Sequence, residues 1–107
     1  MELHEIVEIL HEKEACNVQL LNDTESKSIQ LAEYYRGKIE GYGIAIEIMS
    51  CFDNIFTKND RIQKMFNKIV ESQQFTARKR FLTGKKHALN MCLILIGVNE
   101  NFSCKIG

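Results

Sequence analysis

The chain has 107 residues, of which 45% are hydrophobic and 26% are charged, a composition typical of one folded globular domain. Its longest apolar run, MCLILIGV, is far shorter than the roughly 20 residues that a membrane-spanning helix needs. The N-terminal stretch MELHEIVEIL lacks the basic region that begins a signal peptide. We therefore expect a cytoplasmic protein with no membrane segment, whose four cysteines are reduced thiols.

The formal net charge is zero, but the charges are divided unevenly along the chain. Residues 1–54 carry four Lys or Arg against eleven Asp or Glu, a net of −7, and residues 55–107 carry ten against three, a net of +7. This division leaves two interpretations open. Either the basic half binds an anionic partner, or it pairs with the acidic first helix, in the same chain or in another protein.

Two helices are predicted in the acidic half. Over residues 3–21 the apolar side chains recur at the spacing of one helix face. The polar stretch NDTESKS then interrupts the pattern, and Asp23 or Thr24 is the expected N-cap of the second helix. That helix is expected to run to about Phe52, where DNIFTKND makes the next break.

Two more helices are predicted in the basic half. Residues 60–72 place five apolar side chains on one helix face, and Thr57 or Asn59 is the expected cap. A last helix is expected from Phe75 or Thr76 to about Gly97, followed by a short irregular tail from about residue 98. No segment alternates like a strand. The prediction is a single all-α domain over residues 1–107, a small bundle of about four helices, two of them long.

Small residues recur every four positions on the second and last helices. Glycine inside a helix costs roughly 1 kcal/mol relative to alanine, so the repetition needs a reason. A lowered ridge lets two helix axes approach more closely than the usual 8–10 Å or so. We predict a helix-packing interface within one chain or between symmetry mates, with Gly43 lying off the stripe. The two stripes match at an offset of 47 residues and comprise Gly37, Gly41 and Ala45, and Gly84, Ala88 and Cys92.

The apolar surface of these two helices is wide. The second helix is apolar over about half its circumference, and the last helix is apolar nearly all round from Leu89 to Val98. A homodimer or higher homo-oligomer would cover such surfaces. The alternative is that the side chains are buried within the monomer.

A basic cluster lies where the last helix is expected to begin. Free backbone N–H groups and the helix dipole would add to an anion site there, so the cluster predicts binding of nucleic acid or of a phosphorylated nucleotide. Four aromatic side chains can either stack on bases or belong to the core: Tyr34, Tyr35, Tyr42 and Phe81. The predicted anion-binding residues are Arg78, Lys79, Arg80, Lys85 and Lys86.

The remaining polar residues predict neither a metal site nor a catalytic site. His4, Glu8 and His11 have a spacing used in helical metal sites, but they lie opposite the apolar stripe of their helix, so we expect a solvated face and no metal. His87 has no evident carboxylate partner, and Cys51 and Cys92 are interpreted as small core residues. We predict no catalytic residues, no cofactor and no enzymatic activity.

The leading hypothesis is a helical interaction module that self-associates and binds a macromolecular partner through its charged surface. In general style, a short helical chain with an EYYRGKIEG type of helix looks like small accessory proteins of bacteria and their phages. That likeness implies a host or defence protein, inhibited by the module, as the partner. The alternative is a nucleic-acid or nucleotide-binding protein that uses the basic segment.

Overall fold

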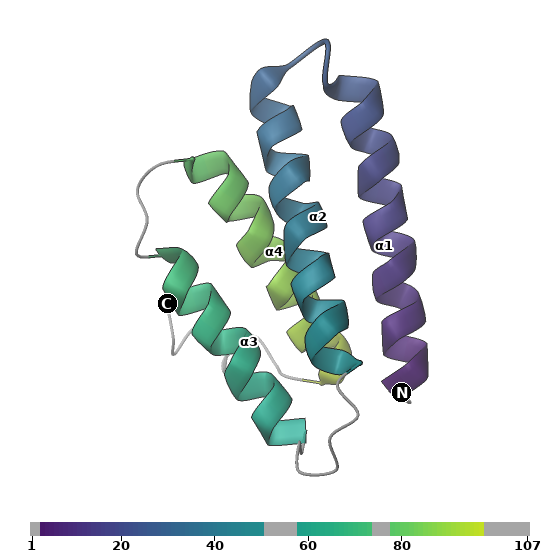
Figure 1. The fold of residues 1–107 in the computed structure, drawn as a ribbon, viewed down its shortest axis with the longest axis vertical. Coiled ribbons are helices and arrows are strands. Elements are labelled where there is room, and N and C mark those ends of the chain that lie inside the picture. The colour runs from purple at the N-terminus through teal and green to yellow at the C-terminus, as the bar shows by residue number, and fades with distance from the viewer. Residues whose placement is uncertain (1–2, 51–57, 74–77, 98–107) are drawn as a thin grey trace.

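A computed structural model of the chain describes residues 3–50, 58–73 and 78–97, which form four α-helices and, within these ranges, no strand (Figure 1). The predicted all-α bundle of four helices is confirmed. Among the described helices none is both long and apolar enough to cross a membrane. The helices are α1 (Leu3–Thr24), α2 (Ile29–Met49), α3 (Lys58–Gln73) and α4 (Lys79–Ile96).

The boundary between α1 and α2 differs from the sequence prediction. Asp23 and Thr24 do not cap α2 but form the last turn of α1, where the Thr24 hydroxyl donates to the Leu20 carbonyl at 2.8 Å. The N-cap of α2 is Ser28, whose backbone is extended (φ −151°, ψ 111°) and whose Oγ accepts from the Leu31 N–H at 3.3 Å. A threonine that bonds to the carbonyl four residues back stays inside its helix, so the serine takes the capping role.

The ends of α3 and α4 also differ from prediction. Asn59 lies inside α3 rather than at its cap, because the helix already begins at Lys58. Helix α4 begins at Lys79, after Arg78 in the left-handed conformation (φ 57°, ψ 47°), and ends where expected, at Gly97 with φ 103°. Glycine takes this conformation without a Cβ penalty, which explains the stop. The predicted positions Phe52, Thr57, Phe75, Thr76 and the tail from about 98 lie outside the described residues.

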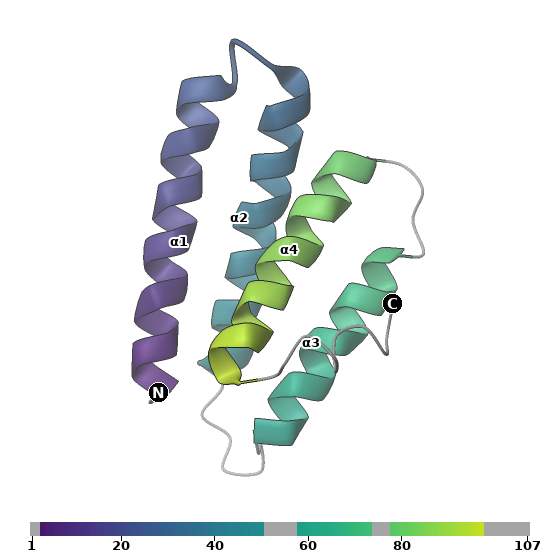
Figure 2. The same ribbon diagram turned by 180° about the vertical axis from the view of Figure 1, so that it is seen from behind.

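The helices are arranged in the spatial order α1, α2, α4, α3 (Figures 1 and 2). Helices α1 and α2 form an antiparallel hairpin, and α3 and α4 also run antiparallel. The two central helices, α2 and α4, run in the same direction and make the most extensive contact in the bundle. Seen from behind, α4 lies in front of α2, between α1 and α3.

The core lies where all four helices converge. Burying each large apolar side chain stabilises the fold by about 1.5–3 kcal/mol. Most of the apolar face of α4 is covered within the chain, although Ile94 remains 52% exposed. Among the described residues the buried core includes Ile6, Leu10, Tyr42, Ala45, Met49, Met65, Phe66, Ile69, Ala88, Leu89, Cys92, Leu93 and Ile96.

Helices α2 and α4 pack backbone to backbone. A Cβ added to Gly41 would lie 2.7 Å from the Ala88 Cβ and 2.5 Å from the Lys85 carbonyl oxygen. A Cβ on Gly37 would overlap the Phe81 carbonyl group. Such distances are too short for real atoms, so only glycine fits there. The small residues of the two stripes therefore face each other within one chain.

The register of this contact matches the offset seen in the sequence. A Cβ on Gly84 would lie 2.9 Å from the backbone nitrogen of Lys38 and would overlap the backbone carbonyl oxygen of Tyr34. Gly37 and Gly41 meet the turns around Lys85 and Ala88 in the same order along both helices. Dispersion contacts between the two main chains offset the entropic cost of the glycines. Off the stripe, a Cβ on Gly43 would meet only the Glu14 carboxylate, at 3.5 Å.

Candidate functional site

The basic cluster at the start of α4 is exposed but does not form a purely cationic surface. Arg78, Lys79 and Arg80 are all exposed, and they line a shallow hollow of about 300 Å³ together with Glu33. The Arg78 guanidinium lies 3.9 Å from the centre of the Phe81 ring, and its Nε is 3.3 Å from a Glu33 carboxylate oxygen. A carboxylate inside the hollow opposes a bound anion.

The remaining predicted anion-binding residues are separated from that hollow. Lys85 and Lys86 are half-buried, and the backbone of Lys85 packs against Gly37 and Gly41 at the helix crossing. Arg78, Lys79 and Arg80 therefore line the same hollow. Lys85 and Lys86 lie on later turns of α4. Within the cluster, Arg78 forms an ion pair with Glu33, which belongs to α2 and not to the acidic first helix.

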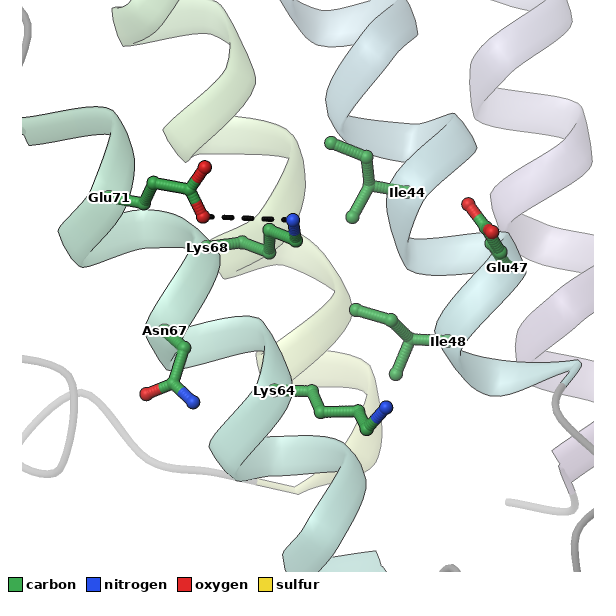
Figure 3. Close-up of a pocket in the computed structure, with 7 residues that line it drawn as sticks. All are labelled: Ile44, Glu47, Ile48, Lys64, Asn67, Lys68 and Glu71. Carbon is green, nitrogen blue, oxygen red and sulfur yellow. Dashed lines mark ion pairs between the residues drawn. The ribbon is translucent and has the colours of Figure 1, made fainter.

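A larger groove lies between α2 and α3 (Figure 3). It has a volume of about 500 Å³. Ile44 and Ile48 extend from α2 towards α3, and Lys64 and Lys68 extend from α3 towards α2. The lining residues, referred to below as the α2–α3 groove, are Ile44, Glu47, Ile48, Lys64, Asn67, Lys68 and Glu71.

The groove follows from helical spacing on both walls. Ile44 and Ile48 are four residues apart on α2, and both are half-buried against the core. Lys64 and Lys68 have the same spacing on α3, and the Lys68 ammonium lies 3.6 Å from a Glu71 carboxylate oxygen. The result is an apolar strip bordered by charges of both signs. This arrangement suits recognition of a surface that is itself partly apolar and partly charged.

Sequence reasoning missed this groove. It noted that the second helix is apolar over about half its circumference, but it treated Lys64 and Lys68 only as part of the basic half of the chain. The apolar width of α2 was the available signal, because Ile44 and Ile48 add to its apolar surface and line the groove. The pairing of the two walls depends on the path of the chain between α2 and α3, which periodicity does not reveal.

A third group of polar side chains lies at the junction of α1, α2 and α4. The Tyr34 hydroxyl and His87 Nδ1 are 2.9 Å apart, so His87 has a partner that sequence reasoning did not find. The Lys38 ammonium lies 5.5 Å from the centre of the Tyr34 ring. Burial lowers the pKa of Lys38, and the nearby charge of Lys13 lowers it further. Burial also raises the pKa of Tyr34.

The other residues weighed from the sequence lie apart from these surfaces. His4, Glu8 and His11 are exposed, and in the described ranges no three His, Cys, Asp or Glu side chains are grouped to hold a metal ion. Tyr42 is buried in the core. Cys92 is buried and Cys16 is exposed, whereas Cys51 and Cys104 lie outside the part of the chain that the structure describes.

Comparison with known proteins adds no relative from which function can be transferred. No protein-family model, no curated protein and no solved structure matches the chain.

Proposed function

We propose that the protein is a non-enzymatic binding module that takes an amphipathic helix of a partner protein into the α2–α3 groove. The observation that carries this proposal is the pair of half-buried isoleucines, Ile44 and Ile48, at a groove of about 500 Å³ with charged borders. Recognition of helices commonly uses an apolar groove that receives anchors one turn apart.

The charges of the groove favour a protein partner over a phosphate backbone. Lys64 and Lys68 stand on one wall, but Glu47 and Glu71 line the same groove. A polyanion would meet those carboxylates, whereas a helix with acidic and basic flanks matches both signs. The nucleic-acid alternative at residues 78–86 meets a similar obstacle, because Glu33 lies within its hollow.

Self-association remains a prediction, and it needs a surface other than the small-residue stripes. Gly37, Gly41 and Gly84 are covered by the α2–α4 contact within the chain. Exposed apolar side chains on other faces, such as Ile29 (79% exposed) and Ile94, are the available contacts for a second copy. Light scattering at micromolar concentration measures the mass, and a monomer would contradict the predicted homo-oligomer.

The groove proposal is tested by site-specific photo-crosslinking in cells. A photoreactive amino acid at Asn67, which lines the groove, is expected to crosslink to one partner at a defined peptide. The same group at Gln19, an exposed position on α1, is the matched control and should give no such product. Mass spectrometry of the crosslinked peptide identifies the partner and shows whether its sequence has helical apolar spacing.

Substitution of the groove floor provides the second arm. The double variant Ile44→Thr and Ile48→Thr keeps branched side chains but removes apolar surface, so the crosslink at position 67 should fall about tenfold. Val18→Thr makes a similar change at a side chain that is 41% exposed on α1, and it should leave the yield unchanged. Equal yields in all three proteins, with circular dichroism showing folded helices, would contradict the proposal.

A further inference from the structure

The first turns of α2 and α4 form a second surface that combines apolar and basic side chains. The two helices run in the same direction, so their N-terminal ends lie towards the same end of the bundle (Figure 1). The hollow of about 300 Å³ described above is lined from both of these ends, and it is referred to below as the α2–α4 hollow. Its lining residues are Ile29, Gln30, Glu33, Arg78, Lys79 and Arg80.

The carboxylate of this hollow is neutralised by two arginines of the same chain. One Glu33 oxygen lies 3.2 Å from an Arg36 nitrogen, and the other lies 3.3 Å from Arg78 Nε. The Arg78 guanidinium also lies 3.9 Å from the centre of the Phe81 ring. Arg78 is therefore held between the two helices, and its charge is used within the chain.

Lys79 and Arg80 keep their charges available to a partner. Both side chains are exposed. In the described part of the chain, no carboxylate oxygen lies within 4.0 Å of the Lys79 ammonium or the Arg80 guanidinium. A carboxylate brought by a partner would form charge-assisted hydrogen bonds with both groups.

Ile29 adds an apolar contact to the same hollow. It is 79% exposed, the highest value among the large apolar side chains of the described ranges. A single exposed apolar side chain is common on protein surfaces, so its exposure alone indicates no partner. In one hollow with two exposed cations, however, it favours a partner that is both acidic and apolar. A phosphate backbone would offer no apolar surface to Ile29 and would still meet Glu33.

We propose that the α2–α4 hollow binds a short acidic peptide segment of a partner protein. One apolar side chain of that segment packs on Ile29, and its carboxylates pair with Lys79 and Arg80. The volume of about 300 Å³ is at the lower limit of ligand pockets, roughly 300–1,000 Å³, so the hollow suits one or two side chains and not a whole helix. This surface is separate from the α2–α3 groove and does not depend on the function proposed there.

The test is titration of the isotope-labelled protein with short synthetic peptides, followed by NMR. The first peptide carries one leucine among glutamates, the second has serine in place of the leucine, and the third has glutamine in place of every glutamate. The first peptide should shift the signals of Ile29, Gln30, Lys79 and Arg80 in a saturable manner. It should bind about fivefold or more tightly than the other two, because each of them lacks one kind of contact.

Several outcomes would overturn the proposal. Equal affinities of the three peptides would do so, as would shifts of the first peptide that centre on other residues or do not saturate. A single-stranded oligonucleotide of the same net charge is the fourth probe. Tighter binding of the oligonucleotide than of the first peptide would identify a phosphate backbone as the ligand and would also overturn the proposal.

Paired charge variants separate the hollow from the general charge of the protein. The double variant Lys79→Gln and Arg80→Gln should weaken binding of the first peptide about tenfold or more, as expected for loss of charge-assisted hydrogen bonds. The matched control, Lys64→Gln and Lys68→Gln, removes the same charge from the α2–α3 groove and should change the affinity less than about twofold. Equal affinities of the two double variants, both folded by circular dichroism, would overturn the proposal.

The apolar contact has its own pair of variants. Ile29→Ser should weaken binding of the first peptide about fivefold or more, whereas Ile94→Ser, at a side chain 52% exposed near the other end of α4, should leave it unchanged. Light scattering of the same proteins tests a second copy as the occupant. If Ile29→Ser abolished self-association and left peptide binding unchanged, the second copy would be the occupant and the proposal would be overturned.

Discussion

At the scale of single residues, the glycines of α2 are not equivalent. Gly37 and Gly41 lie against the main chain of α4, whereas Gly43 faces the Glu14 side chain of α1. A helix backbone cannot move aside as a flexible side chain can. The loss of folding stability caused by an added methyl group therefore depends on whether backbone or side-chain atoms face the glycine. The three positions can be compared within one protein.

Gly37→Ala is expected to lower the free energy of unfolding by about 1–3 kcal/mol, since the new Cβ would overlap the Phe81 backbone and force the helices apart. Gly43→Ala is the matched control. Its Cβ makes an ordinary contact at 3.5 Å, so the gain in helix propensity of up to about 1 kcal/mol should remain. Urea unfolding measures both. Similar stabilities of the two variants would contradict backbone contact at Gly37.

Burial raises the pKa of the Cys92 thiol from 9.0 to about 12. The folded state therefore favours the neutral thiol. The stability that this provides is complete below pH 9 and is lost as the pH rises from 9 towards 12. Between about pH 8 and pH 10.5 the unchanged protein should lose more unfolding free energy than Cys92→Ala does. Parallel losses in urea unfolding would show that Cys92 is not buried.

At the scale of helices, α2 begins at a serine cap whose side chain bonds to the Leu31 N–H at 3.3 Å. Ser28→Ala should lower the free energy of unfolding by about 0.5–1 kcal/mol. Ser26→Ala, two residues earlier in the exposed connection, is the control and should have little effect. Thermal unfolding followed by circular dichroism compares the two variants. If Ser26→Ala were the more damaging, the cap would be wrongly placed.

Helix periodicity was sufficient to predict four helices, but not their ends. The apolar stripe of α3 appears in the sequence as it does in the structure, with Met65, Phe66 and Ile69 buried. Capping depended on competition between neighbours: Thr24 bonds to a carbonyl within α1, which leaves Ser28 to begin α2. Local propensity does not decide which of the two residues caps α2. Serine and threonine hydroxyls can each bond to a carbonyl of the preceding turn or accept from a backbone N–H of the following turn.

The surfaces were less predictable than the helices. The spacing of the small residues indicated close packing, but not whether the partner helix was in the same chain. The cluster at residues 78–86 was evident from charge, yet the carboxylate of Glu33 that modifies it comes from a residue 45 positions away from Arg78. Contacts of this kind depend on the crossing of α2 and α4, which no local pattern contains.

At the scale of the whole molecule, the division of charge along the sequence becomes a division in space. Helices α1 and α2 belong to the acidic half of the sequence, α3 and α4 to the basic half, and α2 and α4 meet in the centre (Figure 1). The Arg78–Glu33 ion pair crosses this boundary. The two hairpins therefore attract each other over distances comparable to the Debye length of about 10 Å at 0.1 M salt.

Raising the concentration of NaCl from about 0.02 M to 0.3 M should lower the free energy of unfolding by up to about 1 kcal/mol, because the attraction between the hairpins is screened. Urea unfolding at each salt concentration measures the effect, with sucrose of equal osmolality as the uncharged control. An increase of stability with salt over this range would mean that repulsion within each half outweighs attraction between the halves.

The arrangement of the four helices centres on the direct contact between the main chains of α2 and α4. NMR cross-relaxation measures it most directly. Because a Cβ on Gly41 would lie 2.7 Å from the Ala88 Cβ, the Gly41 Hα protons should show strong nuclear Overhauser effects to the Ala88 methyl group. In a mixture of labelled and unlabelled protein, isotope filtering should show these effects only within one chain. Their absence, or their appearance between chains, would contradict the account.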